Sequence, residues 1–519
     1  MIGNLVKQYK IHIFIFLGLG YLILGTGLHG DDYAEIMKMQ NFSNFQFFYP
    51  SPYIHEHYIL GLPAHYLLFW AYKFLGYENL IIYDLIKVLA HGICIFFIFK
   101  FLTNYFETDR ALLGSILFIL FPLHDATTYW YMALVYIIPA ALLCYSCHHL
   151  LNNSWLKSFL YGLLGASFFY TSPPFVFGLG MIFVLQRNYK KFLFFISPGI
   201  LYVCYYFYIK IYFSFAEKRI GDSIDLVSFL KNFIAQILSS VESYLGPSFF
   251  LKIFYAIGSL EFISIIILGV IFTYLLKAKT TLSTVSTHSK SLIYSLFCVV
   301  FFSFLIFSIT GFYNHSPFNL GNRTLIYTSF LASILIISFL PSNKGSLVFL
   351  SVFFLLPVFG LSDYWKDWNS NQKLIITSID QSTALADLPP ESLVFVTDNL
   401  YHKLGAFDHI EFFSMSWNTR TIFNKYRSQG AQFIGLTSYL RIKDNKIIDQ
   451  KFSESYQLKE NLFLYESMTD RLIQISPSEL SNLILYKKPA FRHWIQGLKG
   501  TRVEKLIIQL NPRLAYIFK

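Results

Sequence analysis

The feature that most constrains this chain is a series of long apolar segments that recurs from the N-terminus to about residue 361. A helix that crosses the roughly 30 Å hydrocarbon core of a bilayer needs about 20 mostly apolar residues. We therefore predict a polytopic α-helical membrane protein with about eleven transmembrane helices. The candidate segments are 11–28, 79–102, 110–123, 131–150, 156–170, 174–186, 192–209, 252–276, 291–311, 324–340 and 346–361.

Composition agrees with lipid as the main solvent. Of 519 residues, 55% are hydrophobic and only 14% are charged, whereas soluble domains are about 45–50% apolar and about 25% charged. The net charge of +11 is typical of cytoplasmic loops beside anionic headgroups. No basic run with interleaved aromatic residues resembles a nucleic-acid groove. We predict membrane lipids, and not nucleic acid, as partners.

The orientation of the chain follows from the distribution of Lys and Arg, which concentrate in cytoplasmic loops. With a cytoplasmic N-terminus, the short outer loops at 122–130 and 171–174 carry neither residue type. The first apolar segment lacks a small-residue cleavage site, so we expect it to be retained as a helix. This topology requires the apolar stretch 58–75 to lie on the outer membrane surface. The inner loops contain Lys7, Lys10, Arg110, Lys157, Arg187, Lys190, Lys191, Lys277, Lys279, Lys290 and Lys344.

Two domains are expected. Residues 1–361 form the transmembrane domain, with large outer loops at 29–78 and 210–251. After residue 361 the charged residues become more frequent and the long apolar runs stop, which predicts an extracytoplasmic α/β domain over 362–519. Its expected elements are a helix at 364–385, a break at Pro389-Pro390, and strands at 392–397 and 433–440.

The sharpest local motif is His29-Gly-Asp-Asp-Tyr-Ala-Glu35, just past the outer end of the first apolar segment. Two adjacent carboxylates at a membrane surface are costly to desolvate. Asp31 and Asp32 could act as a general base or hold a metal, with Glu35 one helical turn away as a substrate contact. The alternative is that one aspartate caps a helix, while Gly30 allows the sharp exit from the first helix.

Aromatic and acidic residues follow Pro122 in the next outer loop. His124 and Asp125 lie on the same side of the membrane as Asp31 in this topology, and Tyr129 and Trp130 come directly after them. Aromatic rings suit the faces of sugars, but they also form ordinary interfacial belts. An aspartate in an otherwise apolar hairpin is the more informative residue.

Two cations are candidates for contact with a phosphate. Lys87 shares a polar stripe of the second apolar segment with Asp84 and His91, and a structural ion pair is as good an explanation as a substrate contact. Arg323 lies at the outer end of another segment, where it suits bidentate phosphate binding or simple snorkelling to the interface.

Other polar residues are weaker candidates. His55 and Glu56, in His55-Glu56-His57, could contribute acid–base chemistry, but the triplet lacks the helical spacing of a metal site. The five cysteines all lie in apolar runs before residue 299, which favours neither disulfides nor a thiolate metal site.

The order of these features resembles that of the GT-C class of membrane glycosyltransferases, especially the protein mannosyltransferase and aminoarabinose transferase group. An acidic pair follows the first span, and an apolar run from Leu62 to Trp70 continues to Phe74-Leu-Gly76. Phe121-Pro122 then precedes Asp125. The resemblance covers about the first 150 residues. It departs from the family where an arginine is usual early in the second span, since this chain has Asp84 and Lys87 there.

The resemblance implies inverting transfer of a sugar from a polyprenyl-phosphate donor to a lipid, glycan or protein acceptor. It implies that Asp31, with Asp32 beside it, supplies the catalytic carboxylate, and that Asp125 is the second acidic residue. Arg323, and also Lys218 and Arg219 in the second large outer loop, would hold the leaving phosphate. Some members of the class bind a divalent metal, and no residue here decides whether this chain does.

Two other classes stay open. One is a transporter or flippase for a lipid-linked saccharide, and the other is a polysaccharide polymerase or O-antigen ligase. The clustering of polar residues at one face favours surface chemistry over transport. The Lys-, Ile-, Asn-, Phe- and Tyr-rich composition is typical of an AT-rich genome and favours a bacterial inner membrane.

Overall fold

In a computed structural model of the chain, the described residues are 2–42, 62–212, 225–277, 289–311, 315–386, 388–427, 430–487, 491 and 493–510. They divide into two compact units. The first unit comprises Met1–Gly27, Lys38–Pro317 and Gly321–Lys366, and the second comprises Leu28–Met37, Phe318–Leu320 and Asp367–Lys519.

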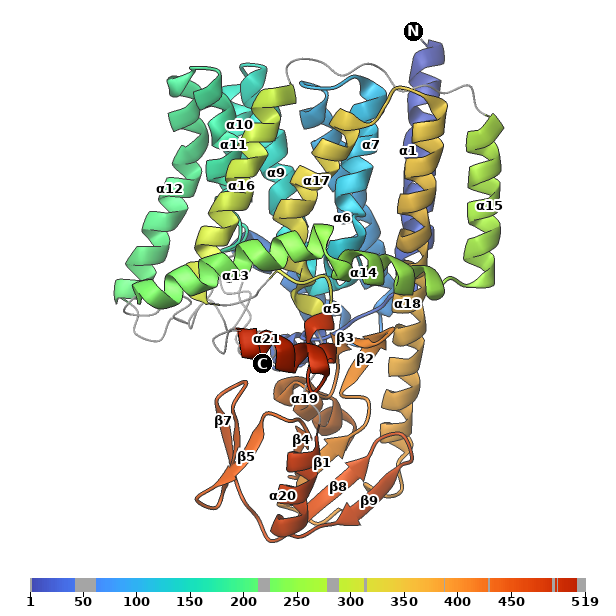
Figure 1. Cartoon of the computed structure of the whole chain (residues 1–519), viewed down its shortest axis with the longest axis vertical. Helices are drawn as coiled ribbons and strands as arrows, with labels where there is room; N and C mark the ends of the chain where they lie inside the picture. The colour runs from blue at the N-terminus through green and yellow to red at the C-terminus, as the bar shows by residue number, and fades with distance from the viewer. Residues whose placement is uncertain are drawn as a thin grey trace. The chain divides into compact units, whose positions relative to one another are not determined.

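The first unit is a bundle of roughly parallel helices (Figure 1). Every predicted apolar segment contains helix. The helices are α1 Ile2–Ile23, α6 Leu80–Leu102, α7 Thr108–Ile119, α9 Leu134–Leu151, α10 Trp155–Ser167, α11 Pro173–Leu185, α12 Tyr189–Tyr212, α15 Phe262–Lys277, α16 Ser289–Thr310, α17 Ile326–Phe339 and α18 Lys344–Gln381.

Among the described residues, six helices are long and apolar enough to cross a membrane, or up to seven if one bent pair counts as a span. This supports a membrane-embedded protein, but with fewer spans than the predicted number of about eleven. The helices α7, α10 and α11 contain only 12, 13 and 13 residues. The predicted span 252–276 is divided into α14 Pro247–Gly258 and α15, which meet at 106°.

Helices α13 Leu226–Leu245 and α14 run across the bundle helices at one of their ends (Figure 1). The Asp225 carboxylate caps α13 by accepting from the backbone N–H groups of Val227 and Ser228. Helix α13 buries its polar residues Gln236 and Ser240. It exposes apolar residues at helical spacing, namely Leu230, Ile234, Leu238, Val241 and Leu245. A helix with an apolar outer face of this kind is suited to lipid and not to water.

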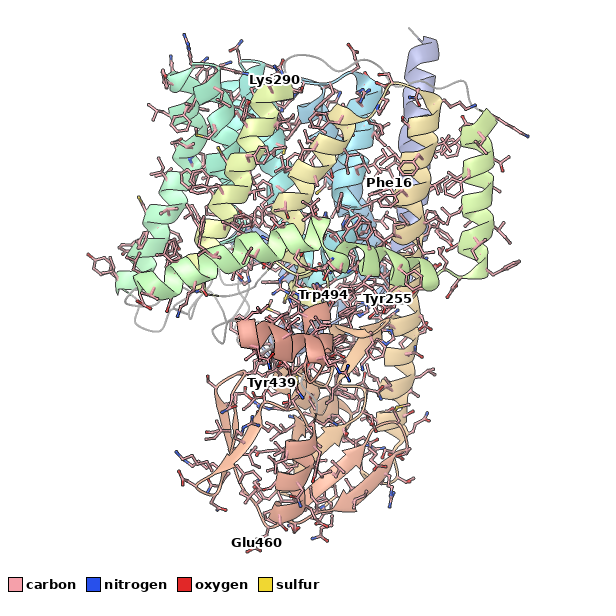
Figure 2. All side chains as sticks on the ribbon, in the orientation of Figure 1. Phe16, Tyr255, Lys290, Tyr439, Glu460 and Trp494 are labelled. Carbon is pink, nitrogen blue, oxygen red and sulfur yellow. The ribbon has the colours of Figure 1, made fainter. Side chains whose placement is uncertain are left out.

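Aromatic side chains fill much of the space between the bundle helices (Figure 2). The ring of Phe16 on α1 lies against Gly92 on α6, where a Cβ atom would come within 2.7 Å of it. The backbone of Val299 on α16 lies equally close to Gly178 on α11, with a built Cβ only 2.6 Å from the Val299 Cα. Glycine thus allows neighbouring helices to approach closely, which is typical of packing between membrane helices.

The apolar stretch 58–75 is helical over the part that the structure describes. Helix α4 Leu62–Ala64 passes through a π-helical turn, His65–Phe69, into α5 Trp70–Leu75. Gly76 then ends the helix with a φ of 60°, a conformation that favours glycine. The position of this helix on the outer membrane surface stays a prediction.

The second unit contains the strands. Its main sheet has the order β4-β1-β8-β9, in which β1 Leu393–Thr397 is parallel to β4 Gln432–Gly435 and to β8 Leu462–Glu466. The central β1 is apolar and almost wholly buried, as parallel strands usually are. The other strands are β9 Arg471–Gln474, the hairpin β2 Tyr401–Leu404 with β3 Phe407–Glu411, and the sheet of β5 Leu440–Lys443, β6 Lys446–Asp449 and β7 Glu454–Gln457.

Short helices complete this unit. They are the first part of α2 Asp32–Asn41, up to Met37, and α19 Ser416–Tyr426, α20 Pro477–Tyr486, η6 Trp494–Leu498 and α21 Arg502–Leu510. The predicted strand at 392–397 is confirmed by β1. The predicted strand at 433–440 is wrong in extent, since β4 ends at Gly435 and β5 begins only at Leu440. The predicted helices 346–361 and 364–385 form one helix, α18, because no breaking residue separates them, and this helix ends at Gln381, four residues before the predicted end.

Candidate functional site

The acidic motif lies in the second unit, and its two aspartates have different environments. Gly30 has a φ of 52°, and α2 begins at Asp32. The Asp32 side chain is fully buried. Its Oδ2 accepts from the backbone N–H of His29 at 2.9 Å, and its own N–H donates to the His29 carbonyl at 3.1 Å. Asp32 therefore closes the turn that starts the helix, which is a structural role.

Asp31 is only partly buried. Its Oδ1 accepts a hydrogen bond of 2.7 Å from the indole Nε1–H of Trp417 on α19. Glu35 lies one turn further along α2 and is also partly buried, and its backbone N–H donates to the Asp31 carbonyl. A partly exposed carboxylate that is held in one orientation can accept a proton from a bound hydroxyl.

Residues from distant parts of the sequence support this motif within the second unit. The Gln372 side-chain amide on α18 donates to the Leu28 carbonyl at 3.1 Å and lies 3.0 Å from His29 Nδ1. The Trp417 ring meets Phe452 edge-on with 4.5 Å between centroids. Lys451 lies over the Phe452 ring and forms a 2.9 Å ion pair with Glu411. The result is an aromatic surface with an adjacent cation that continues from Asp31.

Asp125 lies in the first unit, inside a buried polar cluster. Its Oδ1 accepts from Lys252 Nζ on α14 at 2.8 Å and from the Asn322 amide, and its Oδ2 accepts from Trp365 Nε1 on α18 at 2.8 Å. Lys252 also donates to the Pro317 carbonyl at 2.5 Å. These contacts satisfy both oxygens of the carboxylate, so Asp125 joins three helical elements.

The neighbours of Asp125 are also engaged in structural contacts. His124 Nδ1 lies 2.6 Å from Thr127 Oγ1 and its Nε2 lies 2.8 Å from the Phe118 carbonyl. Burial lowers the pKa of His124 to about 4, so the ring is neutral at pH 7. The Tyr129 hydroxyl donates to the Val358 carbonyl at 3.1 Å, inside the bundle.

Lys87 belongs to a second buried network. Its Nζ forms a 2.8 Å ion pair with Asp84 and donates to Thr26 Oγ1 and to the carbonyls of Gly27 and Tyr129. The Asp84 carboxylate in turn accepts from the backbone N–H groups of Gly25 and Gly27. Of the two explanations from the sequence, these contacts favour the structural ion pair, which joins the end of α1 to α6.

Arg323 lies in a 3₁₀ turn, η5 Leu320–Leu325, and packs on aromatic rings. Its guanidinium carbon lies 5.0 Å from the centroid of Trp130 and 5.6 Å from that of Tyr136, and its Nε donates to the Tyr136 hydroxyl at 3.1 Å. The buried Trp130 Nε1–H has no hydrogen-bond partner among the described residues. A buried donor of this kind usually finds a partner in protein, water or a ligand. The guanidinium of Arg323, held against two aromatic rings, is the basis for a candidate anion site here.

The predicted site residues thus fall into separate groups. Asp31, Asp32 and Glu35 belong to the second unit, whereas the others described belong to the first unit, namely Lys87, His124, Asp125, Tyr129, Trp130 and Arg323. His55, Glu56, Lys218 and Arg219 lie outside the described residues. Within the described parts of the chain, no three His, Cys, Asp or Glu residues are grouped so as to hold a metal ion.

Sequence reasoning missed Lys252, Asn322, Trp365 and Trp417. Each lies more than 100 positions from the aspartate that it contacts, so no local spacing could have indicated the pairing. For Lys252, a lysine at the start of a predicted apolar segment could have indicated a partner, because a buried ammonium group requires one.

The structure defines the class of this protein as a helical, membrane-embedded protein with a C-terminal unit that contains strands. No protein-family model matches the sequence, and no curated protein matches it at a significant level.

Proposed function

We propose that the chain is an integral membrane glycosyltransferase of the GT-C type. It would move a sugar from a polyprenyl-phosphate donor to a lipid, glycan or protein acceptor at the outer face of a bacterial inner membrane. The observation that carries the proposal is the contrast within the acidic pair. Asp32 is buried and closes a turn, whereas Asp31 is partly exposed and oriented by the Trp417 indole.

In the proposed reaction, Asp31 is the general base. The acceptor hydroxyl attacks the anomeric carbon of the donor while the bond from that carbon to the phosphate oxygen breaks, and the configuration inverts. Asp31 takes the hydroxyl proton, and the polyprenyl phosphate leaves with the bonding electrons. A positioned general base contributes typically 10²–10⁴-fold to such a rate, as an order of magnitude.

Arg323 is the proposed cation for the donor phosphate. Its guanidinium is held against Trp130 and Tyr136, and a guanidinium binds phosphate oxygens with paired donors. The buried Trp130 Nε1–H would add a further donor. We assign Asp125 and Lys87 to positioning, because the contacts of each are those of a buried structural ion pair.

The test compares purified Asp31→Asn and Asp32→Asn with the wild type, using transfer from polyprenyl-phosphate sugars to membrane lipids and polysaccharides. We expect Asp31→Asn to lose transfer by roughly 10²–10⁴-fold while keeping the wild-type melting temperature. We expect Asp32→Asn to lower the melting temperature, because a carboxylate that closes a helix turn is worth about 1 kcal/mol. Full transfer by Asp31→Asn would move the base elsewhere.

One observation favours a second function. α14 and α15 meet at a bend of 106°, and broken helices are a feature of many transporters, where they lie near the middle of the membrane. A flippase would move a fluorescent polyprenyl-phosphate sugar between leaflets of a proteoliposome without forming a glycosylated product. Translocation that persists in Asp31→Asn, with no product from the wild type, would support transport over transfer.

A further inference from the structure

Helix α21 is the last element that the structure describes, and the described residues leave most of its apolar side exposed. Its sequence places Val503, Leu506, Ile507 and Leu510 at positions i, i+3, i+4 and i+7, which is one face of a helix. None of its residues is buried, and Leu506 and Leu510 are 57% and 77% exposed. The second unit has a separate core of its own. The apolar face of α21 is therefore not accounted for by packing on that core.

The residues around this face are basic. Between 493 and 510 the charged residues are Lys499, Arg502, Lys505 and Glu504, which gives a net charge of +2 (three minus one). The three basic residues are all exposed. Glu504 is engaged locally, since its carboxylate accepts from the backbone N–H of Gly500 at 2.5 Å. In sequence, residues 511–519 add Arg513 and Lys519 and no acidic residue.

An aromatic residue precedes the helix. Trp494, labelled in Figure 2, begins the 3₁₀ turn η6 and is partly exposed. A tryptophan beside a basic amphipathic helix is the composition of segments that lie in the boundary between headgroups and acyl chains. Each basic residue near an anionic surface strengthens such binding about fivefold.

We propose that α21 binds the surface of an anionic phospholipid bilayer. Val503, Leu506, Ile507 and Leu510 would enter the acyl boundary, while Lys499, Arg502 and Lys505 contact lipid phosphates. Charge decides for lipid over a second copy of the chain, because two faces of the same positive sign repel. The candidate membrane spans belong to the same chain, so a bilayer is always at high local concentration. The inference does not depend on the proposed transferase activity.

The test uses the full chain in nanodiscs, in a Cys204→Ser background that removes the exposed native thiol. A fluorophore is attached at Leu506→Cys on the apolar face or, as the matched control, at exposed Gln509→Cys on the polar face. Nitroxide-labelled lipid should quench the 506 label roughly threefold more than the 509 label in discs containing phosphatidylglycerol. The contrast should shrink in purely zwitterionic discs.

A second variant isolates the charges. Lys499, Arg502 and Lys505 are replaced together by Gln, which removes their charges while the apolar face stays unchanged. This variant should lose the preference for phosphatidylglycerol. Two results would overturn the proposal. One is a 506 label that stays accessible to a water-soluble quencher in every disc. The other is a 506 label that is shielded from water and untouched by lipid nitroxide, which would mean that α21 packs on protein, such as a second copy.

Discussion

The Asp125 carboxylate accepts from an ammonium, an amide and an indole, all contributed by residues far away in the sequence. Such a cluster is stable only as a whole. Removing one partner leaves a buried charge without compensation, whereas removing both charges together can be nearly neutral. The same residue type thus serves three ends in this chain: Asp125 joins helices, Asp32 closes a turn, and Asp31 is the proposed base.

The first prediction concerns this pair. Lys252→Met should destabilise the protein by about 3–5 kcal/mol, because Asp125 is then buried without its cation. The double variant Lys252→Met/Asp125→Leu should recover a large part of that loss. The melting temperature in detergent, detected by the loss of the folded peak in size-exclusion chromatography, measures both effects. Equal destabilisation by the single and double variants would show that the interaction between Lys252 and Asp125 does not contribute to the stability of the protein.

The second prediction concerns His402 in the second unit. Its ring stacks on Trp368 with 4.3 Å between centroids. Burial, and then the neighbouring His409, lower the pKa of His402 to about 4. An unfolded histidine titrates near 6.5. Because the unfolded state then binds the proton first, the stability of the unit is complete above pH 6.5 and falls as the pH drops towards 4.

We expect this loss to reach at most about 3 kcal/mol. His402→Phe keeps the stacking and removes the titration, so the pH dependence should become shallower. Hydrogen exchange of peptides from β2 and β3, measured at pH 7 and pH 4.5 with correction for intrinsic rates, tests this. The same slope in the variant and the wild type would assign the dependence to other groups.

At the scale of elements, the close approach of α18 to α14 is the contact that places Lys252. A Cβ atom at Gly360 would lie 1.8 Å from the Ala256 carbonyl oxygen. No side-chain rotation can relieve this clash, because the neighbouring atom belongs to the backbone. Glycine at this position therefore allows the two helices to touch. The carboxylate of Asp363, one turn further on α18, also accepts from the Glu261 backbone N–H at 2.9 Å.

The third prediction follows from this contact. Gly360→Ala should cost about 1–3 kcal/mol by overpacking, because α14 must move away from α18. The matched control is Gly269→Ala on α15, where a Cβ meets nothing within 4 Å and alanine favours helix by about 1 kcal/mol. Melting temperatures distinguish the two. A Gly360→Ala variant as stable as Gly269→Ala would contradict the close contact.

At the scale of the whole molecule, the distribution of Lys and Arg predicts which loops face the cytoplasm. Lys290, at the start of α16, should be inside, and Glu460, in the second unit, should be outside; both are exposed and both are labelled in Figure 2. In intact cells, a membrane-impermeant maleimide should label Glu460→Cys but not Lys290→Cys, in the Cys204→Ser background. Lysed cells, in which both variants react, are the control. Labelling of Lys290→Cys in intact cells would reverse the orientation.

The number of membrane spans shows where sequence reasoning fails at this scale. Apolar segments predicted the position of every bundle helix, since burial in lipid imposes that composition on the residues themselves. Segment length did not predict crossing. The predicted segments 110–123, 156–170 and 174–186 were already shorter than 20 residues, and α7, α10 and α11 are short in the structure as well. Only the structure shows that residues 252–276 bend sharply after Gly258.

The sequence by itself determined the class of this protein, the existence of a C-terminal α/β part, and the acidic motif at residues 29–35. These are local or compositional properties, set by the solvent around each segment. Tertiary structure alone decided which aspartate is buried, which lysine pairs with Asp125, and that Trp417 orients Asp31. Those contacts join residues more than 100 positions apart, and the pairing of distant segments leaves no periodic signal along a single chain.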